Sequence, residues 1–194
     1  MKKRLLPLLL STALILPLLC PAAAAEETAT RRDLADALYA LANRPSVSQT
    51  QLYSDLTEAD DALHWISSEG YMVGYGSHTM APDQAITRNQ LATVLYEYAK
   101  EHNLALTKRA PIEAGTPKWA DDAISWATAN GVLDGIDRDQ AITASELDRA
   151  LSNLSKVAED PAAKDLNAIM DSPGVSGYAV MAYRDGELIY QRTG

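Results

Sequence analysis

One pentapeptide, Asp-Gln-Ala-Ile-Thr, occurs twice in this chain of 194 residues, at 83–87 and again at 139–143. In each copy the final threonine is followed three residues later by Gln or Glu, which is the pattern of a capping box at a helix start. Leucine or tyrosine then recurs at helical spacing, so each helix is expected to bury a single apolar stripe. A repeat of about 56 residues therefore constrains the fold more than any other feature.

A third copy of this helix start lies near the amino terminus. Thr30 is placed to cap it, and Asp33 takes the third helical position. The apolar stripe is reproduced by Leu34, Leu38 and Leu41. Three equivalent helices predict a mainly α fold with a shared core of approximate threefold character.

A second type of helix precedes the capped helix in two of the three copies. Segments 62–70 and 123–131 align without a gap, and each ends at a glycine where a left-handed residue commonly follows a helix. Each segment then runs on to another glycine, Gly74 or Gly135. The loop after Gly74 is longer than the loop after Gly135, and such insertions between repeats are expected at the surface.

In their order and spacing, these segments resemble the S-layer homology repeats that attach exported bacterial proteins to the cell envelope. Residues 119–135 are similar to the family's Trp-helix-Gly-Gly segment, and Ile86-Thr87-Arg88 is similar to its Ile-Thr-Arg signature. The resemblance implies a pseudo-threefold helical bundle over roughly residues 26–158. Its copies would be a partial first one at about 28–45, a second at about 50–102 and a third at about 112–158.

The copies depart from the family pattern in ways that affect their expected sites. The second copy has Glu58 where the family has a tryptophan. The third has Thr116 in place of the family aspartate and Ala144 in place of the arginine. The first copy holds only its capped helix, so no copy has a complete motif.

The resemblance implies grooves that bind a secondary cell-wall polysaccharide or another peptidoglycan-linked polymer, often one that carries pyruvate ketals. A ketal presents a carboxylate, which a guanidinium can hold bidentately. An arginine directly after an N-cap also lies at the positive end of the helix dipole, which favours an anion. In this chain Arg31 and Arg88 occupy that position.

Carried over residue by residue, the resemblance predicts a ligand site with a role for each member. Asp55 would fix the arginine or a sugar hydroxyl, and we expect it in one groove with Arg88. Trp119 would stack on a pyranose face, and two glycines would let the backbone approach the ligand. The complete predicted set is Arg31, Asp55, Gly74, Thr87, Arg88, Trp119 and Gly135.

Several of these residues also allow a purely structural interpretation. Arg31 and Arg88 are equally consistent with solvated side chains in a first helical turn. Trp65 and Trp126 lie among apolar helix residues and are predicted to be core. An N-terminal hydrophobic staple is an alternative for Trp119. The histidines show no metal-ligand spacing, and we expect neither a metal nor a cofactor.

Residues 1–25 have the features of a secretory signal peptide. Basic residues at 2–4 precede an apolar run at 5–19 and a stretch of alanines, and we expect cleavage after Ala25. The run is too short and too interrupted by proline for a membrane span. A lipoprotein modified at Cys20 is the alternative. Either way, the sequence predicts an exported protein of the cell wall or cell surface, with no membrane span after signal cleavage.

The chain is acidic, with a formal net charge of -9. Loss of the three basic residues of the signal peptide would take this charge to -12. Such a charge argues against nonspecific binding to nucleic acid. Binding of an anionic wall polymer would therefore depend on local arginines and not on the overall field.

The pattern changes after residue 158. Residues 159–173 are expected to form a linker with a short helix, and 174–194 a β-hairpin that turns at 184–186. This tail resembles the opening hairpin of serine hydrolases of the β-lactamase and penicillin-binding type. The Ser-x-x-Lys motif of that family would lie downstream, and no segment of the chain after the hairpin holds it.

Three functions stay open from the sequence. The first is noncovalent anchoring to the cell wall by a binding protein that is not an enzyme. The second is the targeting half of a surface serine hydrolase whose catalytic domain is missing. The third is a structural envelope protein that acts through protein contacts.

Overall fold

The computed structural model describes residues 26–47, 53–76, 78–136, 140–159, 161–171, 177–184 and 186–193. Its helices are α1 (Arg31–Leu41), α2 (Asp61–Ser68), α3 (Arg88–Glu101), the 3₁₀ helix η1 (Lys118–Ala120), α4 (Asp121–Ala129), α5 (Ala144–Leu154) and α6 (Pro161–Met170). Two strands, β1 (Ala179–Arg184) and β2 (Glu187–Thr193), form an antiparallel hairpin. The prediction of a mainly α fold with a short hairpin is confirmed, while the predicted signal peptide at 1–25 lies outside the described residues.

The three predicted capped helices are α1, α3 and α5, and each begins directly after its threonine. In α3 the Thr87 hydroxyl accepts a hydrogen bond from the Gln90 N–H, and Gln90 Oε1 accepts one from the Thr87 N–H at 3.0 Å. Thr30 and Asp33 form the same reciprocal pair at the start of α1, and α5 repeats it. Each box satisfies two backbone N–H groups that the helical ladder leaves unpaired.

The segments just before the three caps are joined in a closed ring of backbone hydrogen bonds. The Ala29 N–H donates to the Ile142 carbonyl at 2.8 Å, Ile142 donates to Ile86 at 3.0 Å, and Ile86 donates back to Ala29 at 3.0 Å. Every segment therefore donates to one neighbour and accepts from the other. Loss of any one segment would leave buried polar groups unpaired, so the ring fixes how the three helices start relative to each other.

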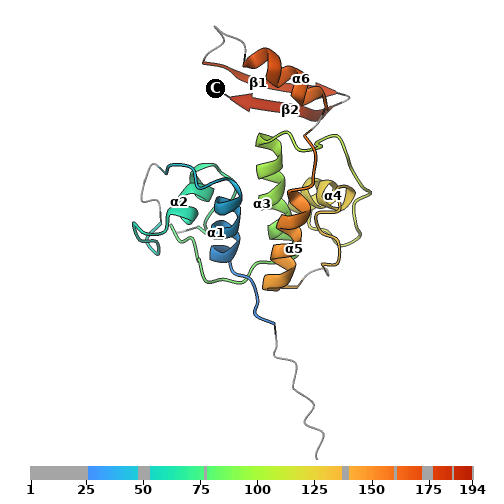
Figure 1. Ribbon diagram of the computed structural model, residues 1–194. Helices are drawn as coiled ribbons and strands as arrows, with labels where there is room; N and C mark the ends of the chain where they lie inside the picture. Colours follow the sequence, from blue (N-terminus) through green and yellow to red (C-terminus); the bar gives the residue numbers. More distant parts are fainter. Residues whose placement is uncertain are drawn as a thin grey trace, which may run out of the picture.

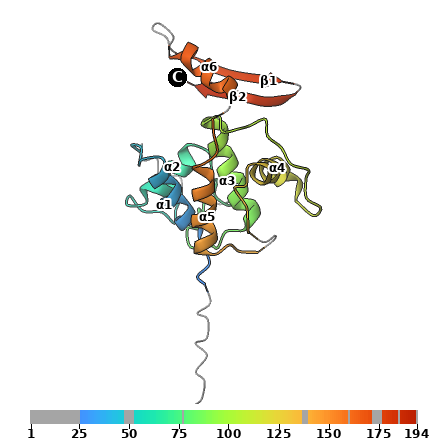
Figure 2. The ribbon, with the colours of Figure 1, turned by 45° about the vertical axis from the view of Figure 1, so that its right-hand side comes forward.

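Beyond this ring the three capped helices are not equivalent. Helix α2 packs against α1 and α4 packs against α3, whereas α5 packs against α1. Figures 1 and 2 show the α1 and α2 pair on one side of the α3 and α4 pair. Each of the first two capped helices is thus covered by the tryptophan-bearing helix of the next copy. Within the described part of the chain, α5 has no such cover.

Two tryptophans of the covering helices α2 and α4 lie in the core. Trp65 in α2 is 4% exposed and meets the ring of Tyr71 edge-on, with ring centroids 5.5 Å apart. Trp126 in α4 is fully buried, and its indole N–H donates to the Leu104 carbonyl at 2.9 Å. The prediction that both tryptophans belong to the core is confirmed, and the polar indole atom of Trp126 is satisfied there.

The C-terminal hairpin packs against the helices. The Asn103 side chain, just beyond α3, donates to the Gln191 carbonyl at 3.0 Å and accepts from the Gln191 N–H at 2.8 Å. On the sheet, the buried Tyr190 donates through its hydroxyl to Asn167 of α6 at 2.8 Å. Figure 1 shows α6 and the hairpin together beyond the end of α3. The predicted hairpin is confirmed. Among the described helices, none is long and apolar enough to cross a lipid bilayer.

Candidate functional site

A surface pocket of ≈ 310 Å³ lies where three copies of the repeat meet. Its lining comes from the start of α1, from the segment 71–75 after α2, from one face of α3 and from η1. Three of the predicted site residues, Arg31, Gly74 and Trp119, line it. We call this pocket the Arg31 groove.

Arg31 is the buried cation of the groove, because only 5% of its surface is exposed. Its Nε donates to the Met80 carbonyl at 2.8 Å, and Nη2 donates to the Val73 carbonyl at 2.7 Å. The Tyr75 ring lies over the guanidinium, with its centroid 4.8 Å from Cζ. Burial lowers the pKa of Arg31 from its ordinary value, although an arginine stays charged at neutral pH. The interpretation of Arg31 as a solvated residue is therefore wrong.

Neutral groups hold this cation in place. Among the residues that the structure describes, no carboxylate forms an ion pair with Arg31. The side chain instead uses two backbone carbonyls and an aromatic face. Since no described carboxylate lies within ion-pair distance and Asp55 acts on its charge only from farther away, the guanidinium at the positive end of α1 is suited to an anionic group from outside.

Asp55 supports Arg31 through the loop that carries Met80. Its two carboxylate oxygens accept the backbone N–H groups of Met80 at 2.8 Å and Ala81 at 2.7 Å. Desolvation opposes ionisation, but these hydrogen bonds outweigh it and lower the pKa of Asp55. Because the Met80 carbonyl is the acceptor for Arg31, Asp55 positions the arginine through the loop. The expectation that Asp55 shares a groove with Arg88 is wrong, since the structure ties Asp55 to Arg31.

Gly74 is required by close packing within the protein. A Cβ at this position would lie 2.2 Å from Cε1 of Tyr53 and 2.6 Å from the carbonyl oxygen of Thr79. The Gly74 N–H also donates to the Tyr53 hydroxyl at 3.1 Å. The space that a side chain at position 74 would need is thus filled by Tyr53 and the loop. Sequence reasoning missed Tyr53, which lies just outside the motifs that carried the prediction.

Thr87 acts on the groove through the capping box of α3. The Gln90 side chain that completes the box also donates through Nε2 to the Tyr75 hydroxyl at 3.1 Å. Tyr75 in turn covers Arg31, so the helix cap orients the aromatic face of the groove. Sequence reasoning also missed Tyr75. The available signal was an aromatic residue directly after Gly74, at the start of the longer loop.

Trp119 forms the exposed wall of the groove. It lies in η1, and 62% of its surface is exposed, beside Val73 at 70% and Tyr75 at 41%. A residue that serves as a hydrophobic staple would be covered by its partner, so this exposure does not fit that alternative. A flat apolar ring next to a charged group is a surface on which a sugar ring can stack.

Arg88 lies in a different environment from Arg31. It is 5% exposed, and its Nη1 and Nη2 donate to Oε2 and Oε1 of Glu113, each at 3.1 Å. Gly135 has φ of +74°, and its carbonyl accepts a hydrogen bond from Arg149 Nη1 at 3.2 Å. Neither Arg88 nor Gly135 lines the Arg31 groove. The solvated interpretation is wrong for Arg88 too, because its charge is buried and paired.

Residues 53–92 match the S-layer homology domain. This match contains α2, the loop held by Asp55 and the start of α3. Over 95 residues the chain is also 33% identical to Cell surface glycoprotein 1 of Acetivibrio thermocellus, an alignment that covers 43% of this chain. The chain spans only 4% of that relative's length.

The Arg31 groove extends beyond the matched S-layer homology domain. Gly74, Tyr75 and Gln90 lie inside the match, whereas Arg31 comes from the segment before it and Trp119 from the segment after it. The groove is therefore completed by the two segments that flank the matched domain. The domain match and the surface relative together support a surface-associated protein that anchors through this type of domain.

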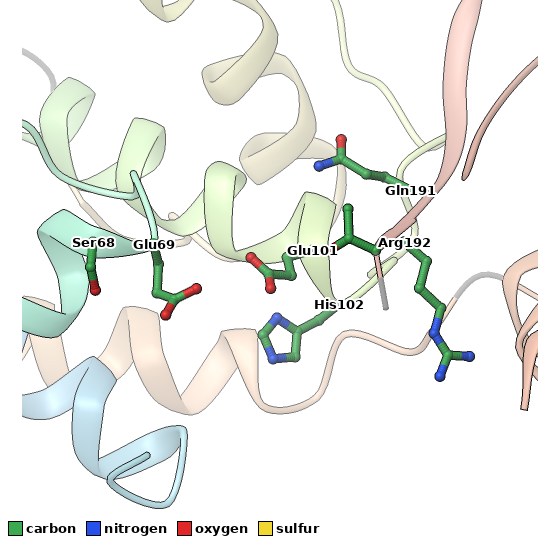
Figure 3. A pocket seen from close by; sticks show the side chains of 7 residues that line it. Ser68, Glu69, Glu101, His102, Gln191 and Arg192 are labelled. Carbon is green, nitrogen blue, oxygen red and sulfur yellow. The ribbon is translucent and has the colours of Figure 1, made fainter. Parts of the chain in front are cut away.

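A second pocket, of ≈ 430 Å³, lies where α2 and α3 end against β2 (Figure 3). Glu69, Glu101 and His102 line it from the helices, and Arg192 lines it from the strand. Desolvation, with the nearby Glu101 charge, raises the pKa of Glu69. Glu101 accepts a hydrogen bond from the Tyr71 hydroxyl at 2.8 Å. This pocket contains none of the predicted site residues, and it belongs to the junction between the helices and the hairpin.

Proposed function

We propose that this protein anchors noncovalently to the bacterial cell wall by binding an anionic secondary polysaccharide in the Arg31 groove. The observation that carries the proposal is a buried arginine whose hydrogen bonds within the described residues go to neutral groups, beside an exposed tryptophan. A pyruvate ketal or another sugar carboxylate would pair with the Arg31 guanidinium. The pyranose ring that bears this carboxylate would stack on Trp119.

In this proposal the positive charge of Arg31 binds the polymer although the chain as a whole is acidic. The formal net charge is -9, so the long-range field repels an anionic polymer. At physiological salt this repulsion is screened beyond about 8 Å, whereas a buried cation within contact distance is screened much less. Binding is therefore expected to strengthen as salt rises from very low concentration and then to weaken as the contact itself is screened.

The proposed location follows from the same function. The leader at residues 1–25 would direct export, and the repeats would then retain the mature protein at the wall without a covalent bond or catalysis. We infer that the cyclic ring at Ala29, Ile86 and Ile142 reflects a pseudo-threefold bundle in which the three copies present unequal grooves. The Arg31 groove would be the working one.

The test is cosedimentation of the protein with purified cell walls in three forms: untreated, stripped of the secondary polymer, and depyruvylated with the polymer retained. Retention on untreated walls that is lost with the polymer supports anchoring. Loss on depyruvylated walls identifies the ketal carboxylate as the recognised group. Equal retention on all three preparations, or on none, contradicts the proposal. Self-assembly without any wall polymer would favour a structural role through protein contacts.

A second candidate is the targeting half of a surface serine hydrolase. The hairpin favours it, because Met181 and Tyr183 on one face of β1 are 60% and 61% exposed. Large apolar side chains on one face of a strand are typical of a face that packs against a further layer of the fold. Labelling of native envelopes with a fluorescent penicillin tests this candidate. A labelled species that an antibody to this chain also recognises supports it, and an unlabelled species in a preparation with active penicillin-binding proteins contradicts it.

A further inference from the structure

The second buried arginine of the repeats is already bound to a carboxylate of the same chain. Arg88 and Arg31 occupy the same first helical position after equivalent caps, and each is 5% exposed. Arg88, however, holds Glu113 through two parallel hydrogen bonds of 3.1 Å. This is the geometry with which a guanidinium binds a free carboxylate.

The position of Glu113 is consistent with an occupant of a ligand site. Its side chain is 24% exposed, against 6% for the Arg88 side chain, so Glu113 lies nearer to solvent than the arginine that it binds. The Thr128 hydroxyl of α4 also approaches Oε1, at 3.4 Å. The carboxylate is therefore held between Arg88 of α3 and Thr128 of α4.

One polar atom of Arg88 is left without a partner. In the part of the chain that the structure describes, its buried Nε has no hydrogen-bond acceptor. The same atom of Arg31 donates to the Met80 carbonyl at 2.8 Å, within the longer loop after Gly74. The loop after Gly135 is shorter, its residues 137–139 lie outside the described part of the chain, and no described residue in it supplies such a carbonyl to Arg88. A buried donor of this kind costs free energy unless something accepts from it.

We propose that Glu113 is an internal anionic occupant of the Arg88 site, and that removal of its carboxylate creates a binding site for a small external carboxylate. The site would offer Nη1 and Nη2 of Arg88 and the Thr128 hydroxyl, with the unpartnered Nε as a further donor. In the intact protein Glu113 excludes anionic ligands from this site, so the Arg31 groove binds alone. That last consequence rests on the proposed function, whereas the site itself is tested without any wall polymer.

The test is chemical rescue of Glu113→Ala by acetate. The melting temperature is measured as sodium acetate replaces sodium chloride at constant ionic strength, and the arginine Nε–H resonances are followed by NMR. Acetate at about ten times its dissociation constant should shift the folding equilibrium of Glu113→Ala about elevenfold towards the native state. The Arg88 Nε–H resonance should move along the same titration curve.

Three further proteins serve as controls. Wild type and Glu113→Gln keep the site filled, and Arg88→Ala/Glu113→Ala lacks the guanidinium, so none of them should respond to acetate beyond the chloride baseline. If Glu113→Ala is unfolded in chloride, acetate should refold it. A Glu113→Ala protein that is folded and insensitive to acetate, or that stays unfolded in acetate while Glu113→Gln is folded, overturns the proposal. Cosedimentation is not involved, so failure here leaves the wall-binding proposal intact.

Discussion

Two arginines that are buried in the described part of the chain, Arg31 and Arg88, follow equivalent helix caps but are held by different groups. Arg31 is held by the carbonyls of Met80 and Val73, while Asp55 acts on its charge from beyond ion-pair distance. Arg88 is held by the carboxylate of Glu113. The difference arises from the segments that follow, because a longer loop brings backbone carbonyls to the first site and an acidic side chain fills the second. An arginine at an equivalent position in the repeat therefore does not by itself make an equivalent binding site.

The largest effect that separates the two sites is expected from Arg31→Ala. If this guanidinium pairs with a polymer carboxylate, its loss should weaken retention on cell walls about hundredfold, because truncating one partner of a buried charge pair costs about 2–5 kcal/mol. Arg88→Ala should leave retention unchanged. Lys164→Ala, at an exposed position on α6, is the control for loss of one positive charge. Equal losses for Arg31→Ala and Arg88→Ala would contradict the assignment of one working groove.

Gly74→Ala should produce the next largest effect, which is a loss of folding stability. The added Cβ would overlap Tyr53 and the Thr79 carbonyl, and relief requires the loop to shift, at a cost of about 2 kcal/mol. Gly135→Ala places its Cβ 2.6 Å from the Arg149 side chain, whose flexible end can move away. Its main cost is the positive φ, about 1 kcal/mol. Urea denaturation measures both. A larger loss for Gly135→Ala would contradict this ranking.

The repeat pattern predicted the helices well because it depends on local chemistry. Thr30, Thr87 and Thr143 each cap a helix with a partner three residues away, so the signal lies within one turn. The tryptophans of α2 and α4 were placed in the core by their apolar neighbours alone. The ring through Ala29, Ile86 and Ile142 was not predicted, because its backbone hydrogen bonds join segments far apart in the sequence.

The site was predicted only in part, for a similar reason. Arg31, Gly74 and Trp119 do meet in one pocket. The partner of each arginine, however, depends on loops whose course the sequence pattern does not determine. Asp55 was expected beside Arg88 but supports Arg31, since its carboxylate holds the loop that carries Met80. Tyr75 was missed because no repeat position corresponds to a residue in an insertion.

Trp119→Ala should have a smaller effect than Arg31→Ala. This effect should be on binding and not on stability. Loss of the exposed ring removes a stacking surface worth about 1 kcal/mol, so retention on cell walls should fall about fivefold to tenfold. The melting temperature should hardly change, because 62% of the residue is already exposed. Tyr183→Ala is a matched control, since this aromatic residue on the hairpin is 61% exposed. A similar loss for the control would indicate nonspecific apolar binding.

Acid should have the smallest effect, and this effect is expected at the loop that holds Arg31. Hydrogen bonds from Met80 and Ala81 outweigh desolvation and lower the pKa of Asp55 below its usual value of about 3.9. A lowered native pKa means that the stabilisation is present above the unfolded value and is lost as the pH falls through the native value. The Arg31 side should therefore loosen below about pH 4.

The third copy has Thr116 in the position of Asp55, so it lacks this acid-labile contact. The measurement is NMR of the Met80 and Ala81 amides from pH 6 to pH 2, compared with Asp55→Asn. In wild type both amide resonances should move with one apparent pKa below that of a free aspartate. In Asp55→Asn this step should disappear, because no charge remains to titrate at that position. Amides that titrate alike in both proteins would show that the loop responds to another carboxylate and that Asp55 does not control the Arg31 groove.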